Sequence, residues 1–237
     1  MQPWNEDLVD ALDTPIDSAL IEFSKNPDLR IFMPLDISFG GDAIIAHSPI
    51  TKITDLKGKK IGVEKNWISH FFLSYVLDTV GLSTKDVILV DMKASDIGSK
   101  MIAGKINAGS IQEPWLTKAS EFTETNVLAT SKEHPIVYAV LIVKKQTLEQ
   151  KREAFEKLRK IWVSSLDILS KNKVDAIRIM APYLGIPEVE LAEQLEKIKF
   201  VDSNINLIPA MEKVQKILLK DNLIKEPLDL EKITDIN

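Results

Sequence analysis

Residues 53–63, ITDLKGKKIGV, join a polar turn to a short strand and set the pattern for the middle of the chain. The turn is rich in Asp, Gly and Lys, whereas Ile61 and Val63 favour a buried strand. From residue 52 to residue 131 the pattern continues as strand, helix, strand, helix, strand and helix. Strands that alternate with helices in this way predict βαβ units and an α/β sheet.

Short β-branched runs mark the predicted strands. They cover residues 29–35, 42–47, 60–63, 87–90, 106–111 and 136–143. If the runs 42–47 and 136–143 pair with each other, the chain leaves one lobe, builds a second and then returns. We therefore expect lobe 1 over residues 1–50 plus 132–237 and lobe 2 over residues 51–131. Two crossing strands would join them at a hinge beside a cleft that can trap a ligand.

Apolar residues at helical spacing mark the helices. A helix over about 68–80 ends at Gly81, and Ser95 is a predicted N-cap of a helix that ends near Gly104. After residue 147 the pattern changes to helix upon helix, and we expect this tail to pack back on the sheet. The first predicted helix of the tail carries an apolar stripe from Phe155 to Leu169, and the second covers about 174–184. A third helix is predicted after Pro187. A fourth is predicted after Pro209, with four residues facing inward: Met211, Val214, Ile217 and Leu218.

Composition excludes several kinds of chemistry. The 237 residues contain no cysteine, so disulfides, thiolate zinc sites, iron–sulfur clusters and a cysteine nucleophile are all excluded. The formal net charge is −5, and no stretch combines dense Lys and Arg with aromatic residues, so we expect no nucleic-acid partner. No window approaches the ~20 apolar residues of a membrane span, and the N-terminus shows no signal peptide.

Motifs for catalysis or cofactor binding are also missing from the sequence. His47, His70 and His134 lie far apart without metal-ligand spacing, so we expect no metal site. The chain has no P-loop, nucleophile elbow or dinucleotide fingerprint. We therefore predict no catalytic residue and no cofactor.

An ordered set of short motifs resembles a known family. The motifs are LDISFGGDAI at 35–44, DLKGKKIGVE at 55–64, SHF at 69–71, ASD at 94–96, EPWL at 113–116 and NLIKEPLDL at 222–230. Together they are similar to the substrate-binding proteins of nitrate/sulfonate/taurine-type ABC importers, whose superfamily also includes thiamine-pyrimidine precursor proteins. The resemblance implies the α/β fold of type II periplasmic binding proteins, with two lobes, a hinge of two crossing strands and a C-terminal helical tail.

The resemblance departs from the family at the front of the chain. Family members carry a strand, a loop, a helix and a second strand before the stretch that matches residues 8–15, LVDALDTP. We expect lobe 1 to lack this leading βαβ portion, because the clone is truncated, the start codon is misplaced or the natural protein is short. A sheet edge left open in this way could pair two copies, although we expect a monomer.

The turn at residues 64–70 is the first candidate for ligand contact. A strand ends here and a helix is predicted to begin near Ser69, so backbone N–H groups at the helix start suit an anionic group. Asn66, Trp67, Ser69 and His70 are the candidate residues. In the alternative interpretation Asn66 or Ser69 is only a helix cap and Trp67 only packs.

The other candidates follow or precede predicted strands. Glu113 and Trp115 come after a strand, where ligands gather in open α/β sheets, although a lone Trp also suits core or hinge packing. Further cleft-lining candidates come from the end of the strand 29–35 and from the loop expected after the first remaining strand. These candidates are Asp36, Ser38 and the Gly40–Gly41 pair, of which Gly41 is taken as a ligand contact, and Asp13 and Thr14.

The resemblance implies a solute-binding component of an ABC importer. Such a protein would capture a small anionic or heteroaromatic ligand by hinge closure, present it to an ABC permease and work in the periplasm or another extracytoplasmic space. One alternative is an enzyme on the same scaffold, of the menaquinone or pyrimidine pathways. The missing cysteines argue against the cysteine-dependent synthases among these enzymes but not against those that need no cysteine. The other alternative is a truncated fragment that folds but binds nothing tightly.

Overall fold

Two separate β-sheets organise the chain in this computed structural model, which describes residues 4, 8–122, 125–203 and 205–234. Unit 1 comprises Met1–Ile37, Tyr138–Glu212 and Lys225–Asn237, and unit 2 comprises Ser38–Val137 and Lys213–Ile224. Their boundaries lie elsewhere than those of the expected lobes, because residues 38–50, 132–137 and 213–224 group with unit 2.

The sheet of unit 2 has five strands in the order β5-β4-β6-β3-β7. Their bounds are β3 Asp42–His47, β4 Lys60–Val63, β5 Ile88–Asp91, β6 Ala108–Gln112 and β7 Thr125–Thr130. Strands β5, β4 and β6 are parallel, as βαβ units require, whereas β3 runs antiparallel to β6 and β7. The predicted pairing of 42–47 with 136–143 is therefore wrong, since both neighbours of β3 lie within unit 2.

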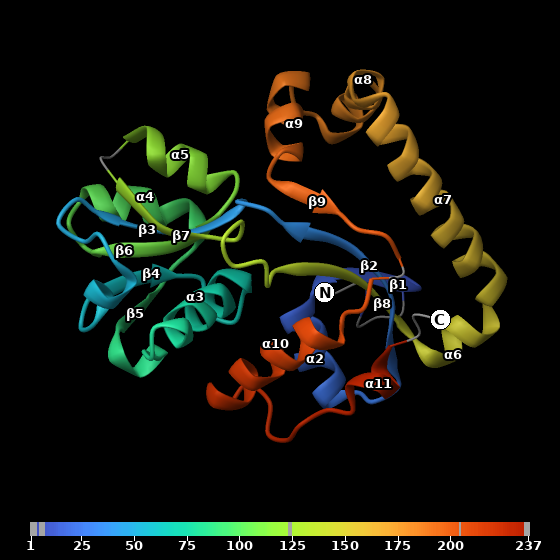
Figure 1. Cartoon of the computed structure of the whole chain (residues 1–237), viewed down its shortest axis with the longest axis horizontal. Helices are drawn as coiled ribbons and strands as arrows, with labels where there is room; N and C mark the ends of the chain where they lie inside the picture. The colour runs from blue at the N-terminus through green and yellow to red at the C-terminus, as the bar shows by residue number, and fades with distance from the viewer. Residues whose placement is uncertain (1–3, 5–7, 123–124, 204, 235–237) are drawn as a thin grey trace. The chain divides into compact units, whose positions relative to one another are not determined.

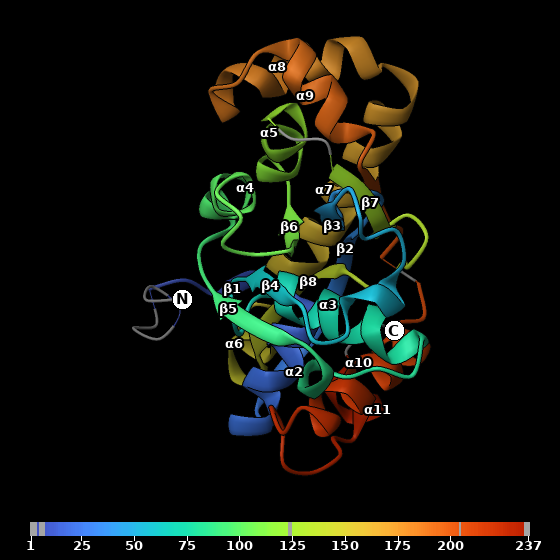
Figure 2. The same ribbon diagram turned by 90° about the vertical axis from the view of Figure 1, so that its left-hand side faces the viewer.

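Helices cover both faces of this sheet, with α4 and α5 on one side and α3 on the other (Figure 2). Their bounds are α3 Ile68–Thr79, α4 Ala94–Ile102 and α5 Trp115–Phe122. A Cβ atom on Gly109 would lie 2.3 Å from Ile97 Cγ2, so the missing side chain lets α4 approach β6 closely. Helix α4 begins one residue before Ser95, and its N-cap is Lys93, so the predicted cap at Ser95 is wrong.

The sheet of unit 1 has four strands in the order β1-β8-β2-β9. Their bounds are β1 Ala11–Pro15, β2 Leu29–Ser38, β8 Tyr138–Lys144 and β9 Ile198–Phe200. Strands β1 and β2 both run antiparallel to the central β8. Helix α2, Ile16–Lys25, follows β1 directly and buries most of its apolar residues (Figure 1).

The helical tail packs in two parts. Its elements are α6 Lys145–Gln150, α7 Arg152–Lys171, α8 Lys173–Leu184, α9 Glu188–Leu195, α10 Ile208–Lys220 and α11 Leu230–Ile233. Phe155 of α7 packs on Phe32 of β2 with the ring centroids 5.2 Å apart. Farther along, Ile161 is 63% exposed, and α8 and α9 bury their own small apolar cluster. The expected stripe on α7 is thus buried only in part, whereas the four predicted inward-facing residues of α10 are all buried.

Helix α10 is shared between the two units, because its first five residues belong to unit 1 and residues 213–220 to unit 2. The chain also crosses between the units after Ile37 at the end of β2, and after Val137 at the start of β8. Among the described residues, no helix is both long and apolar enough to span a membrane.

Candidate functional site

One edge of the unit 2 sheet gathers most of the predicted ligand residues that lie in this unit. Strands β4 and β6 are parallel and end there, and the antiparallel β3 begins there. The segments 64–67, 113–114 and 40–41 therefore meet at one edge, which is the usual place for ligands in sheets of this kind. We call it the carboxyl edge of unit 2.

The turn after β4 differs from the capping interpretation. Helix α3 begins at Ile68 with Trp67 as N-cap, and no side chain caps it, so neither Asn66 nor Ser69 is the cap. Asn66 has a left-handed backbone with φ of 63°. Its N–H donates to His70 Nδ1 at 3.3 Å, which leaves the proton of the neutral ring on Nε2. Burial is the main cause that lowers the pKa of His70, so the ring is neutral near pH 7.

Ser69 and Trp67 lie in opposite environments. The Ser69 side chain is buried, and its carbonyl accepts a hydrogen bond from Ser110 Oγ of β6 at 2.7 Å. This bond fixes the first turn of α3 on the sheet. The Trp67 indole is 55% exposed, which is unusual for so large an apolar group. Trp67 and His70 thus give the start of α3 an aromatic surface and a neutral ring.

Glu113 and Trp115 follow β6, as predicted, but both have local structural partners. The Glu113 carboxylate accepts hydrogen bonds from Thr117 N at 3.2 Å and Thr117 Oγ1 at 2.9 Å, and so it satisfies the first turn of α5. Trp115 lines a cavity of about 340 Å³ between α4 and α5, with Lys118 Nζ 4.6 Å from its ring centre. These contacts favour packing for Trp115.

A buried hydroxyl chain holds the start of β3. Ser131 Oγ accepts from Gly40 N at 2.8 Å and Asp42 N at 3.2 Å, and it lies 2.8 Å from Ser38 Oγ. Because two N–H groups occupy its lone pairs, the Ser131 hydroxyl must donate to Ser38. The Ser38 hydroxyl in turn hydrogen-bonds the Asp42 carboxyl. Ser38, predicted as a ligand contact, is thus part of an internal network, and Gly41 beside it accepts from Glu113 N through its carbonyl at 2.9 Å.

Asp42 was not among the predicted site residues. It is 6% exposed, and its burial raises the pKa of the carboxyl to about 6, with the negative charge of Glu113 adding to the effect. The hydrogen bond from Ser38 opposes this shift. The signal in the sequence is a carboxylate at the head of a strand whose next four residues are apolar, DAIIAH at 42–47.

The remaining predicted residues belong to unit 1. Asp13 and Thr14 lie within β1, opposite Leu141 and Val140 of β8, so their predicted place in a loop is wrong. Asp36 lies in β2 beside an irregularity in its pairing with β8. Asp13 is exposed and Thr14 buried, as expected for successive residues of a strand.

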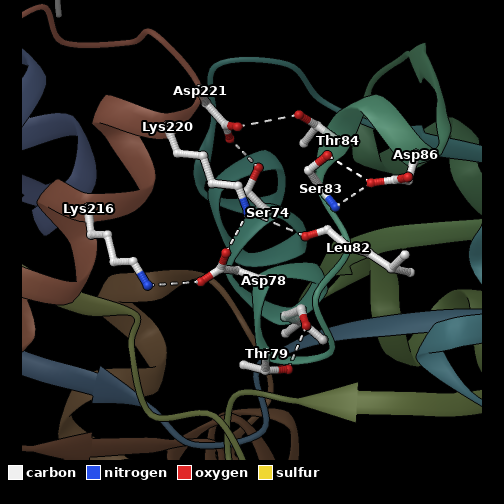
Figure 3. Close-up of polar contacts among 11 residues, drawn as sticks. Ser74, Asp78, Thr79, Leu82, Ser83, Thr84, Asp86, Lys216, Lys220 and Asp221 are labelled. Atoms are coloured by element: carbon white, nitrogen blue, oxygen red, sulfur yellow. Dashed lines mark hydrogen bonds and ion pairs between the residues drawn. The ribbon is translucent and has the colours of Figure 1, made fainter.

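A second polar cluster of unit 2 joins α3 to the end of α10 (Figure 3). Asp221 accepts from Ser74 Oγ at 2.5 Å and from Thr84 Oγ1 at 3.4 Å. Asp78, one turn beyond Ser74, accepts from Lys220 Nζ at 2.5 Å and lies 3.5 Å from Lys216 Nζ. We call these residues the α3–α10 clasp. Within the described ranges, no three His, Asp or Glu side chains are grouped to hold a metal ion.

Comparison with known families gives a match that covers more than half of the chain. The sequence model of the NMT1/THI5-like family matches residues 29–176. The chain belongs to the NMT1/THI5-like family. Its relatives include a protein of Brucella abortus strain 2308 that is named as a binding protein and is 24% identical over 166 residues. That match covers 68% of this chain and 52% of the relative, so the chain spans about half the length of the curated relatives it matches.

Solved structures share the fold of this NMT1/THI5-like chain. The periplasmic aliphatic sulphonate binding protein SsuA from Escherichia coli matches with a TM-score of 0.82 at 17% identity, over 98% of this chain and 77% of that one. The desulfurization enzyme DSZB matches with a TM-score of 0.69 at 16% identity, over 96% and 83% of the two chains. The predicted periplasmic-binding-protein fold is confirmed, and binding proteins and an enzyme both occur on it.

Proposed function

We propose that this chain is the solute-binding component of an ABC-type importer, which captures a small anionic or heteroaromatic ligand and presents it to a permease outside the cytoplasm. The observation that carries the proposal is the family match over residues 29–176. The fold shared with a sulphonate-binding protein supports it. By the predicted mechanism, a ligand that contacts both units only in a closed state shifts the population toward that state.

The carboxyl edge of unit 2 holds the residues that we propose as the main ligand contacts. The start of α3 carries the positive end of a 12-residue helix, which favours an anionic group. His70 offers a neutral Nε2–H donor there, and Trp67 offers an exposed indole. We take these two side chains as the main contacts, with Asn66 setting the turn that presents them. The other predicted contacts, in both units, are secondary candidates.

Calorimetric titration of the full chain tests the proposal. The panel is methanesulfonate, taurine, nitrate and an aminopyrimidine. We expect one class to bind with a stoichiometry of one. Trp67→Ala should weaken that binding at least about tenfold, the size expected when a ligand buries an aromatic side chain. Tyr183→Ala, which removes a 90% exposed ring from α8, is the matched control and should leave the affinity unchanged.

The same titration separates the proposal from its rivals. Recovery of the bound compound unchanged, checked by mass spectrometry, supports a binding protein, whereas its conversion would favour an enzyme on this fold. If no member of the panel binds to a chain that gives a cooperative unfolding transition, the importer function is contradicted.

A further inference from the structure

Asp42 and Gln112 form an unusual neighbouring pair inside unit 2. They are direct partners in the antiparallel register of β3 and β6, so their side chains leave the same face of the sheet with Cβ atoms about 5 Å apart. Gln112 Oε1 is shielded from solvent and has no hydrogen-bond partner among the described residues. The Asp42 side chain next to it is almost fully buried.

The protonation state of Asp42 decides whether this acceptor can be satisfied. An ionised carboxylate offers only acceptors, so it leaves Gln112 Oε1 without a donor. A buried polar atom without a partner costs free energy. A neutral carboxyl keeps one oxygen to accept from Ser38 and gains an O–H that can donate to Gln112. A proton taken from solvent would therefore complete the hydrogen bonding of the pair.

We propose that Asp42 and Gln112 form a proton switch at the start of β3. With the proton bound, Asp42 donates to Gln112 Oε1 and joins β3 to β6 through their side chains as well as their backbones. With the proton released, this side-chain link is lost, and the turn at Gly40 and Gly41 keeps its bonds to Ser131 Oγ and to Glu113 N. If the chain binds a solute at the carboxyl edge, as proposed above, the switch makes that binding pH-dependent.

The charges around Asp42 place the switch in a mildly acidic range. Burial and the negative charge of Glu113, just beyond β6, raise the pKa of Asp42 to about 6. The neighbours from the other elements are the uncharged Ser38 at the end of β2, Gln112 on β6 and Ser131 after β7. The proton would therefore be exchanged between about pH 5 and pH 7.

A carboxyl-carbon NMR titration of the full chain tests the switch without any ligand. In the unmodified chain we expect a midpoint near pH 6 for Asp42, with the amide signals of Gly40 and Gly41 following the same midpoint. Gln112→Met removes the acceptor while keeping the side-chain length, and should lower the midpoint by about one pH unit. Ser38→Ala removes the donor to the ionised form and should raise it. Gln150→Met, on the exposed end of α6, is the control and should change nothing.

The opposite signs of the two variants make the test decisive. If Gln112→Met leaves the Asp42 midpoint unchanged or raises it, the pKa is set without a hydrogen bond to Gln112 and the switch is refuted. Gln112→Leu provides a second variant if the Met variant does not give a folded amide spectrum. Failure of the titration would leave the proposed function standing, and failure of the ligand panel would leave the switch standing.

Discussion

Two aspartates of unit 2, Asp42 and Asp78, have pKa values that are shifted in opposite directions. Asp42 begins a buried strand, and the loss of its hydration raises its pKa to about 6. Asp78 lies on the α3–α10 clasp, and its hydrogen bond with Lys220 is the main cause that lowers its pKa. The comparison teaches that the residue type alone does not determine the pKa. Burial without a cation raises the pKa of an Asp carboxyl, whereas a partly exposed position beside two lysines lowers it.

The largest expected effect comes from breaking the buried cluster at Ser131. Ser131→Ala leaves the N–H groups of Gly40 and Asp42 without their acceptor in a buried site. We expect the free energy of unfolding to fall by about 2–4 kcal/mol, since each unpaired buried donor costs about 1–3 kcal/mol. Urea unfolding followed by circular dichroism measures this change.

The matched control is Ser99→Ala on α4, an exposed serine whose hydroxyl bonds only a carbonyl of its own helix. It should change stability by less than about 0.5 kcal/mol. Equal effects of the two variants would contradict the role assigned to the hydroxyl chain.

The next effect concerns the pH dependence of stability through Asp42. Its folded pKa of about 6 lies above the ordinary value of 3.8, so between these values the folded chain binds more protons than the unfolded one. This group therefore favours folding below about pH 4, and its contribution is lost as the pH rises toward 6 and beyond. Asp42→Asn should remove this slope and raise the free energy of unfolding at pH 7.5 by about 2–3 kcal/mol. Unfolding midpoints from pH 4 to pH 8 measure it, and parallel curves for the two proteins would refute it.

The smallest effect belongs to Asp78 of the clasp. Because its folded pKa is lowered, the carboxylate stabilises the fold above its ordinary pKa, and that contribution is lost as the pH falls below about 4. Asp78→Asn should cost only about 0.5–1 kcal/mol at pH 7, as partly exposed ion pairs do, and the difference should vanish in 1 M salt.

Lys213→Gln, which changes a further exposed lysine of α10, is the control for this variant and should have no measurable effect. A loss from Asp78→Asn that persists in high salt would show that packing, rather than charge, holds α3 against α10.

Local sequence patterns predicted the elements well where apolar periodicity was strong. The strands at 42–47 and 60–63 have the expected bounds, and α3 begins and ends within one residue of its prediction. Strand β7, TNVLAT, was missed because its polar residues hide the alternation, and β9 has only three residues. The N-cap of α3 was predicted wrongly, because the prediction relied on a capping side chain and the cap residue Trp67 uses none.

The candidate site was predictable only in part, because its contacts join distant segments. Following a strand was enough to place residues 64–67 and 113–114 at one edge. The link between Asp42 and Ser131 spans 89 residues, and nothing near either residue indicates it. Strand β3 likewise belongs to the unit 2 sheet because it pairs with β6 and β7, and local propensity does not encode this pairing.

The division of unit 2 into Ser38–Val137 and Lys213–Ile224 has a consequence for synthesis on the ribosome. When Val137 has been made, Ser74, Asp78 and Thr84 still lack the partners that the end of α10 supplies. At about 5–20 residues per second, roughly 4–17 s pass before that helix end is complete. For this interval the nascent sheet lacks the contacts that α10 makes with one side of α3, and a ribosome that stalls between these points would hold a unit 2 without its final helical segment.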